Sequence, residues 1–159
     1  MTAHPVIAEP PGLPWNNRGG VRVMLALKLE SRANARGHTK YKSAANAKQR
    51  DETRRAVETH LRACPVEPPY YVTIIRIAPR RLDSDNAQTA AKSVRDGIAL
   101  AIGLDDGSDR YRWDYPQRKP TRAEKALSGG YGVEIRIETR EQWLARNPEC
   151  PHCGRSEDA

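Results

Sequence analysis

No stretch of the 159-residue sequence approaches the roughly 18 consecutive apolar residues that a membrane-spanning helix needs. The first residues also lack the basic and then apolar layout of a secretory signal. Cysteine is scarce, with three in all, and two of these share one CxxC, so a disulfide framework is not predicted. These absences exclude membrane-spanning and disulfide-stapled classes and favour a soluble intracellular protein in a reducing compartment.

The sequence has a surplus of positive charge, most of it in one segment. The 27 Lys and Arg residues against 20 Asp and Glu give a net charge of +7. Residues 36–62 hold eight basic and three acidic side chains, so they supply +5 of it. Such a field attracts polyanions, of which nucleic acid is the usual one. Charge alone does not separate nucleic acid from an anionic membrane surface.

The length suits a single domain, and the chain has no internal repeats. Residues 1–20 carry four prolines and three glycines without periodicity, which predicts a flexible arm. The folded domain is expected to span 21–140. The tail, 141–159, is expected to start as a helix and to end disordered.

Hydrophobic periodicity predicts strands that alternate with helices. Helix formers with a thin apolar stripe predict a solvated helix over 43–63. Apolar residues spaced by three and four predict a core-facing helix over 86–102, and Gly103 stands where it would end. Residues 117–132 are predicted to be a long basic connection. The predicted strands, from alternation or from β-branched and aromatic runs, are 21–30, 70–78, 110–115 and 133–138.

This order predicts an α/β or α+β domain with a small mixed sheet flanked by two main helices. In the last predicted strand one face is apolar and the other charged, so one set of side chains should point inward. The inward set is Val133, Ile135 and Ile137, and the outward set is Glu134, Arg136 and Glu138.

Two pairs of aspartates are notable in so basic a chain. Asp83 and Asp85 cross a strand-to-helix turn, where residues two apart in an extended chain share a face about 6–7 Å apart. Asp105 and Asp106 are expected at the far end of the 86–102 helix unless the chain turns back. Clustered carboxylates need a cation to stay ionised, and Mg²⁺ is usually held by one or two of them. Such a metal polarises a phosphodiester and activates water, so the pattern suggests a metal-dependent nuclease.

The same aspartates also have an ordinary structural interpretation. Asp83 or Asp85 can be the N-cap of the following helix, where a negative charge complements the helix dipole. Asp105 and Asp106 precede Gly107 and can belong to a turn. Spacing alone favours this interpretation over a metal site.

One segment resembles the core motif of RusA-type Holliday-junction resolvases, in which a D-x-D-N element opens a helix and a D-D element follows it: residues 80–108, RRLDSDNAQTAAKSVRDGIALAIGLDDGS. The polar loop and basic helix after the first strand resemble the same family, as does the closing strand, so the similarity covers about residues 21–140. It implies a homodimeric cytoplasmic endonuclease, commonly encoded by a phage or prophage, that nicks four-way DNA junctions symmetrically with Mg²⁺ or Mn²⁺.

By this resemblance the three essential, metal-holding acids fall on Asp83, Asp85 and Asp106. The lysine that the family has three residues after the Asn is replaced by Thr89. Lys92, one turn later, is expected to direct its amine toward the site and to serve as the catalytic lysine. Ser84 replaces a hydrophobic residue between the acids, which should affect packing more than chemistry.

Basic and polar residues around the acids are expected to contact DNA, and their number would give a strong salt dependence. Each also has a simpler interpretation, as a solvated loop, a neutralising partner of the acids or a solvated helix face. The basic stretch on the first helix continues through Arg50, Arg54 and Arg55. The expected contacts are Asn34, Arg36, His38, Lys40, Lys42, Lys48, Arg80 and Arg81.

Two further motifs have alternative interpretations. Trp113 and Tyr115 can stack on unpaired bases, although core or edge-strand positions are the commoner role of such residues. The CPHC motif has the spacing of half a zinc site, with His152 between its cysteines. Structural zinc takes four ligands and no second pair is present, so zinc at Cys150 and Cys153 is not expected.

The sequence therefore predicts a homodimeric, divalent-metal-dependent endodeoxyribonuclease that acts on Holliday junctions or related branched DNA in recombination or repair and has no membrane partner. A basic DNA-binding module that cuts nothing is the alternative from a different class. A zinc-binding adaptor built on the CPHC motif is a third.

Overall fold

The computed structural model describes residues 20–30 and 39–147. Its sheet is mixed and five-stranded, and strand β2 (Tyr70–Ile77) lies at the centre. On one side it pairs antiparallel with β5 (Gly132–Glu138), which pairs in turn with the edge strand β1 (Val21–Leu25). On its other side it pairs in parallel with β3 (Tyr111–Asp114) and then with β4 (Gln117–Arg118). The predicted small mixed sheet is confirmed.

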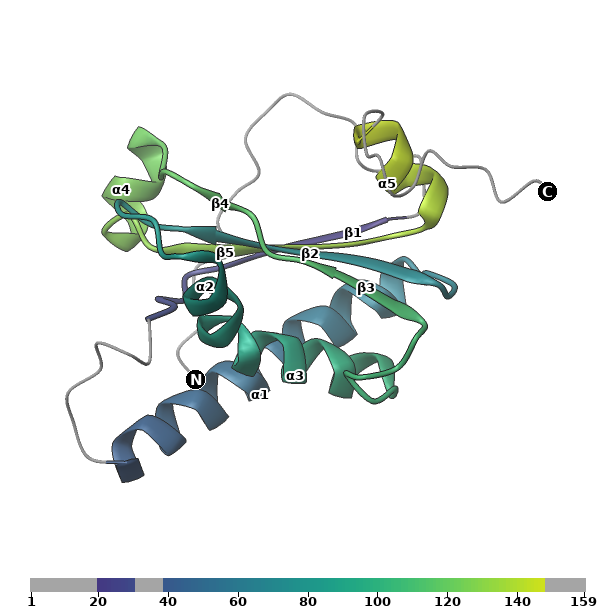
Figure 1. Cartoon of the computed structure of the whole chain (residues 1–159), viewed down its shortest axis with the longest axis horizontal. Coiled ribbons are helices and arrows are strands. Elements are labelled where there is room, and N and C mark those ends of the chain that lie inside the picture. The colour runs from purple at the N-terminus through teal and green to yellow at the C-terminus, as the bar shows by residue number, and fades with distance from the viewer. Residues whose placement is uncertain (1–19, 31–38, 148–159) are drawn as a thin grey trace.

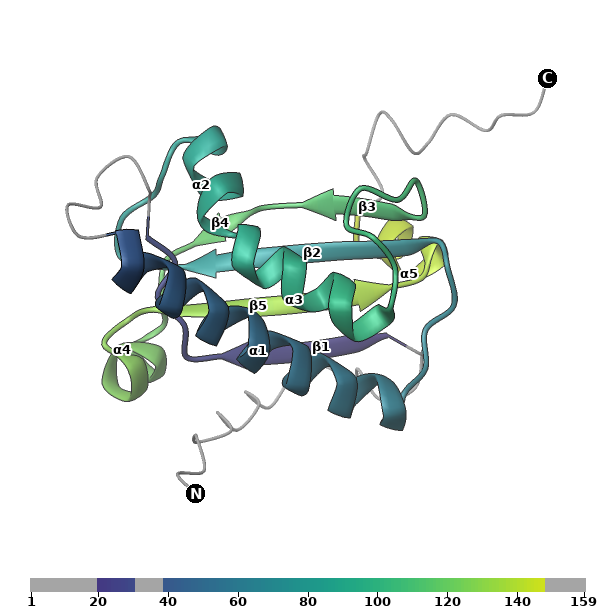
Figure 2. The ribbon, with the colours of Figure 1, turned by 90° about the horizontal axis from the view of Figure 1, so that it is seen from below.

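Helices cover the two faces of this sheet unequally (Figure 1). The long helix α1 (Thr39–Ala63) and α3 (Lys92–Ile102) lie side by side across one face, with α2 (Ser84–Ala90) at its end (Figure 2). The short helices α4 (Arg122–Ser128) and α5 (Arg140–Arg146) lie on the other side, at opposite ends. Among the described helices, none is both long and apolar enough to cross a membrane.

The main core lies between the sheet and the α1–α3 layer. Val133, Ile135 and Ile137 are fully buried, as predicted for the inward face of β5. The register places Ile74 beside Ile135 and Val72 beside Ile137, so the apolar faces of β2 and β5 form one surface. Burial of that surface is the main contribution to stability.

Helices α1 and α3 approach closely at Gly97. A Cβ atom added there would lie 2.5 Å from the carbonyl oxygen of Arg50 and 2.8 Å from Cβ of Thr53. Backbone cannot retreat as a flexible side chain can, so the absence of a side chain sets the distance between the two helices.

Several predicted boundaries need correction. The helix predicted over 43–63 begins earlier, at Thr39. The helix predicted over 86–102 is two helices, because α2 ends at Ala90 and α3 begins at Lys92, with Ala91 as the cap between them. Strand β1 ends at Leu25 rather than at residue 30, because Leu25 pairs with Val133, next to the start of β5. The predicted connection over 117–132 contains β4 and α4. The predicted stop at Gly103 is confirmed, with φ 82° and its N–H bonded to the Ala99 carbonyl.

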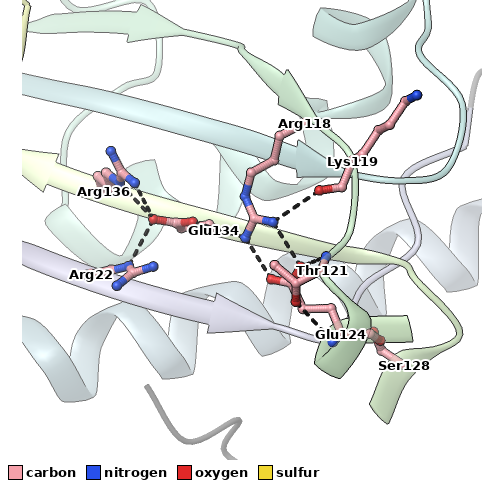
Figure 3. Close-up of polar contacts among 8 residues, drawn as sticks. All are labelled: Arg22, Arg118, Lys119, Thr121, Glu124, Ser128, Glu134 and Arg136. Carbon is pink, nitrogen blue, oxygen red and sulfur yellow. Dashed lines mark hydrogen bonds and ion pairs between the residues drawn. The ribbon is translucent and has the colours of Figure 1, made fainter. Parts of the chain in front are cut away.

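Two of the three residues predicted to face outward on β5, Glu134 and Glu138, are buried, and Arg136 is partly buried. Ion pairs surround Glu134 (Figure 3). Glu134 is 1% exposed, and its carboxylate contacts Arg136 at 2.7 Å, Arg22 at 2.9 Å and Arg118 at 3.4 Å. Arg118 also pairs with Glu124 at 2.7 Å, inside the capping box of α4. These ion pairs join β1, β4, β5 and α4.

Glu138 is buried as well, because Arg146 of α5 pairs with it. The same helix packs Trp143 against Tyr71, with ring centroids 5.4 Å apart. The predicted helical start of the tail is therefore confirmed by α5, and this helix is fixed to the second face of the sheet. Residues 1–19 of the arm predicted over 1–20, and the end of the tail, lie outside the described residues.

Candidate metal and nucleic-acid site

The acid turn, Asp83 to Asp85, follows β2 and opens α2. Asp83 occupies the N-cap position with extended backbone (φ −62°, ψ 157°), but its side chain makes no capping hydrogen bond. Asp85 lies in the first turn, and its carboxylate has one long contact, 3.5 Å from the Ser84 hydroxyl. Both side chains are exposed, and neither forms an ion pair with any described residue. Their charges are therefore open to a cation from outside the described chain.

A glutamine from the neighbouring strand holds the backbone just before the acid turn. Gln117 Nε2 donates to the Leu82 carbonyl at 2.7 Å, and Gln117 Oε1 accepts from the Leu82 N–H at 2.9 Å. The same Oε1 accepts from Arg76 Nη1 at 3.2 Å. One side-chain amide thus satisfies both polar groups of the peptide backbone at Leu82, as a neighbouring strand would.

Arg76 supports this arrangement from the end of β2. It is 8% exposed, and it donates from Nη1 to the Arg80 carbonyl at 2.8 Å and from Nε to the Leu29 carbonyl at 3.1 Å. Burial lowers the pKa of Arg76 from its ordinary value. The backbone leading to the acid turn is therefore anchored to buried groups, which favours a fixed position for the carboxylates.

Sequence reasoning missed Arg76 and Gln117. The available signal was a lone arginine in the otherwise apolar end of the β2 run, where alternation points it toward the helices. Arg76 pairs with Gln117 in the parallel β2–β4 register, and that pairing is not visible without the fold.

Arg80 and Arg81 stand directly before the acid turn, and both are exposed. Within the described chain neither forms an ion pair with Asp83 or Asp85. Two roles were predicted for Arg80 and Arg81, neutralising the acids or contacting phosphate. The second is favoured, since both guanidinium groups are available to an external anion.

The second acidic pair is used locally. Asp105 Oδ1 accepts from the Gly107 N–H at 2.9 Å, which is the predicted turn chemistry. Asp106 Oδ2 lies 3.0 Å from Arg95 Nε, and the Asp106 carbonyl accepts from Arg95 Nη2 at 2.7 Å and from Trp113 Nε1 at 3.1 Å. Arg95 and Trp113 thus fix this loop against α3 and β3.

The start of α2 and the loop between α3 and β3, which carry the two acidic pairs, lie toward different ends of the sheet (Figure 2). Trp113, which binds the Asp106 carbonyl, pairs with Val72, whereas Gln117, which holds the acid turn, pairs with Arg76. Four residues of strand separate these anchors by roughly 13 Å. No group of three or more His, Cys, Asp or Glu able to hold a metal occurs within 20–30 and 39–147. One chain does not unite the three predicted acids, and the role of Asp106 stays a prediction.

Lys92 opens α3 on the exposed surface and forms an ion pair with Asp96 at 3.3 Å. It lines a cleft between α1 and the α2–α3 pair, together with Thr89 and with Lys42 of the predicted DNA contacts. The Thr89 hydroxyl donates to the Asp85 carbonyl at 2.8 Å. The cleft therefore begins on the helix that carries the acid turn.

The structure says less about the other residues that were predicted to contact DNA or considered as zinc ligands. Lys48 is exposed on α1, 3.9 Å from Glu52, a weak i,i+4 pair that leaves its amine accessible. The remaining candidates lie outside the described residues or have side chains that are not described: Asn34, Arg36, His38, Lys40, Cys150, His152 and Cys153.

Trp113 and Tyr115 are partly buried rather than presented to a base. Trp113 packs on Tyr111 with ring centroids 4.7 Å apart and carries the Arg95 guanidinium 5.0 Å from its ring centre. The Tyr115 hydroxyl accepts from Arg95 at 3.4 Å, and burial raises the pKa of Tyr115. Both rings help to pack β3 against α3, which favours the core interpretation.

Neither the protein-family models nor the curated protein sequences provide a match to this chain.

Proposed function

We propose that the chain is a divalent-metal-dependent endodeoxyribonuclease that acts on four-way or other branched DNA, as its resemblance to RusA-type resolvases implies. The acid turn is the observation that carries the proposal. Two exposed carboxylates have no cation from the described chain, lie beside two exposed arginines, and follow a backbone segment anchored by buried groups. A solvated surface turn needs none of this anchoring.

The donor set at the acid turn suits a hard cation. Mg²⁺ and Mn²⁺ prefer oxygen ligands, and one or two carboxylates with substrate phosphates commonly complete the shell. Asp83 and Asp85 would hold the ion, which when bound polarises the phosphodiester and activates water. Arg80 and Arg81 would bind the flanking phosphates.

Lys92 fits the role of a charge-stabilising group. Its exposed pair with Asp96 is of the kind that contributes little, so the amine can exchange partners at small cost. An ammonium group brought to the cleaved phosphate would stabilise the charge that develops there. Paired nicks on two strands need two such sites related by a two-fold axis, which is the reason to propose a homodimer.

The test is cleavage of a labelled synthetic four-way junction, compared with linear duplex of the same sequence, in Mg²⁺, in Mn²⁺ and in EDTA. Paired nicks that depend on metal and are confined to the junction support the proposal. Binding to the junction without nicks in either metal would instead identify a DNA-binding module, the alternative favoured by the basic surplus alone.

A further inference from the structure

The cleft between α1 and the α2–α3 pair has a volume of about 570 Å³. Gln49 of α1 connects its sides: Nε2 donates to the Lys28 carbonyl at 3.1 Å, and Oε1 accepts from the Ser93 hydroxyl at 2.8 Å. Three segments distant in sequence are thus joined by one side chain. The volume lies within the range of sites that hold a small ligand and is far too small for a DNA duplex.

The charges that line this cleft are not balanced. Lys28 pairs with Glu30 at 2.7 Å, and Lys92 pairs with Asp96 at 3.3 Å, so both acids of the lining already have a cation. Arg50 also lines the cleft, and its guanidinium has no ion pair or hydrogen bond within the described chain. Its Nε is buried without an acceptor. Because Nε has no exposed surface, an anion in the cleft would meet the remaining nitrogens of this guanidinium, which have no acceptor within the described chain.

We propose that this cleft binds the backbone phosphate of an unpaired DNA strand, with Arg50 as the main cation. Guanidinium forms paired, charge-assisted hydrogen bonds with phosphate oxygens. Asn46 and Thr89 add an amide and a hydroxyl to the lining. No aromatic side chain lines it among the described residues, so base stacking contributes nothing and binding is independent of sequence.

The inference rests on the proposed function for the identity of the polyanion. Forks and flaps carry an unpaired strand at the branch point, and a four-way junction exposes one where its base pairs open. A cleft that begins on the helix of the acid turn is placed to take such a strand beside the cleavage site. The phosphate chemistry itself is shared by a DNA strand and by a free nucleotide, so the experiment must separate these two sources.

The test measures fluorescence anisotropy of a labelled single-stranded oligonucleotide in EDTA, where cleavage cannot contribute. Arg50→Gln should weaken binding by about tenfold and lower the slope of log affinity against log salt by about one. Arg62→Gln is the matched control, because Arg62 is exposed on the same helix, does not line the cleft and is not among the predicted DNA contacts. Equal weakening by both variants would show a general charge effect and overturn the proposal.

Two further arms complete the experiment. Ala45→Trp, at an exposed position of the lining, should fill the cleft and weaken strand binding without changing charge, and it decides the matter if Arg50→Gln does not fold. Competition by inorganic phosphate or a deoxynucleoside monophosphate as effective as that by the strand, per phosphate, would assign the cleft to a small ligand instead. Strand binding that depends on Arg50, in a protein that never nicks junctions, refutes the proposed function alone.

Discussion

At the scale of single residues, the acid turn offers the sharpest prediction. Asp83→Asn and Asp85→Asn should each abolish metal-dependent cleavage and leave junction binding intact, because the variants keep the shape of the turn and lose the charge that holds the ion. Since neither exposed carboxylate supports the fold through a strong contact, the free energy of unfolding should change by less than about 0.5 kcal/mol. Cleavage rate and thermal unfolding are the measurements.

Asp105→Asn is the matched control for this pair of variants. It removes the same charge from an exposed loop, and the new side-chain oxygen can still accept from the Gly107 N–H as the carboxylate does at 2.9 Å. Cleavage at the wild-type rate by Asp83→Asn or Asp85→Asn would show that the acid turn is only a helix start.

A second residue-scale prediction concerns acid pH. Hydrogen bonding from Arg118 lowers the pKa of Glu124 from 4.5 to about 2. Burial by itself raises the pKa of Glu134, but Arg136 and Arg22 lower it below its ordinary value. Because both groups have lower pKa values folded than unfolded, their stabilisation is complete above about pH 4.5 and is lost as the pH falls toward 2.

Urea unfolding measured across that pH range checks this prediction. Glu124→Gln should cost about 1–3 kcal/mol at pH 7, because the Arg118 guanidinium loses its strongest charged acceptor. The same variant should show a shallower loss of stability between pH 4.5 and 2. If the free energy of unfolding falls with pH equally for the variant and the wild type, Glu124 does not contribute to the acid sensitivity.

At the scale of elements, the β2–β4 pairing is expected to control catalysis through Gln117. Gln117→Ala removes both hydrogen bonds to the Leu82 backbone, at 2.7 and 2.9 Å, and should cost about 2 kcal/mol. The loosened acid turn should lower kcat by about tenfold or more, since misplacement of reacting groups is costly. Single-turnover cleavage at a temperature where the variant is fully folded provides the measurement.

Gln142→Ala is the control for Gln117→Ala. Gln142 Oε1 also accepts from a backbone N–H, that of Thr139 at 3.0 Å, but at the start of α5 and away from the acid turn. It should lose stability and keep kcat. Proportional losses of stability and activity in both variants would mean that Gln117 has no special part in positioning the acids.

The α1–α3 contact gives a prediction about packing. Gly97→Ala places a Cβ atom 2.5 Å from the Arg50 carbonyl oxygen, so the helices must separate, and the expected cost is about 1–3 kcal/mol. This outweighs the roughly 1 kcal/mol by which alanine favours a helix over glycine. Leu100→Ala, at an exposed position of the same helix, should have a smaller effect in the same urea titration. A stabilised Gly97→Ala variant would contradict the close approach.

Most of the elements could be predicted from local periodicity, because β2, β5 and α3 bury one continuous apolar face. The break at Ala91 could not, since neither glycine nor proline marks it and local helix propensity gives no reason to stop there. Helix α4 was predictable in principle, because Thr121 and Glu124 have the spacing of a capping box, but the surrounding basic residues and prolines indicated a loop.

The charged face of β5 and the anchor of the acid turn were beyond local reasoning for another reason. Glu134 is buried because Arg22 comes from β1, 112 residues away, and Arg118 from β4. Gln117 and Arg76 meet only through the strand register. The acidic residues of the candidate site were visible in the sequence, whereas the groups that position them depend on tertiary contacts.

At the scale of the whole molecule, the candidate functional groups gather at one end. The acid turn and its two arginines lie between the end of β2 and the start of α2, and the end of α2 and the start of α3 line the cleft with Lys92. Figure 2 shows these element ends on one side of the molecule. Asp106, the third predicted acid, is held at the start of β3 by Arg95 and Trp113. The strand positions that anchor these two regions are roughly 13 Å apart, whereas bonds between Mg²⁺ and its ligands are about 2.1 Å long. No group of three acids able to share an ion forms within the described part of one chain.

This separation makes the assembly testable. If Asp106 acts together with the acid turn, it must come from the other copy in a homodimer, and we expect that arrangement. Asp85→Asn and Asp106→Asn should each be inactive alone. A mixed dimer of the two should regain one working site, because the Asp85 of one subunit meets the Asp106 of its partner.

Single-strand nicking of a four-way junction by the mixed variants, after denaturation and joint refolding, is the measurement. Half of the refolded dimers should be mixed, and each should cut one strand but not make the paired cut, since its second site carries both substitutions. If the acids acted within one chain, every site in the mixture would be defective and no nicks would form. Full activity of Asp106→Asn alone would instead show that this aspartate has only a structural role, in its ion pair with Arg95.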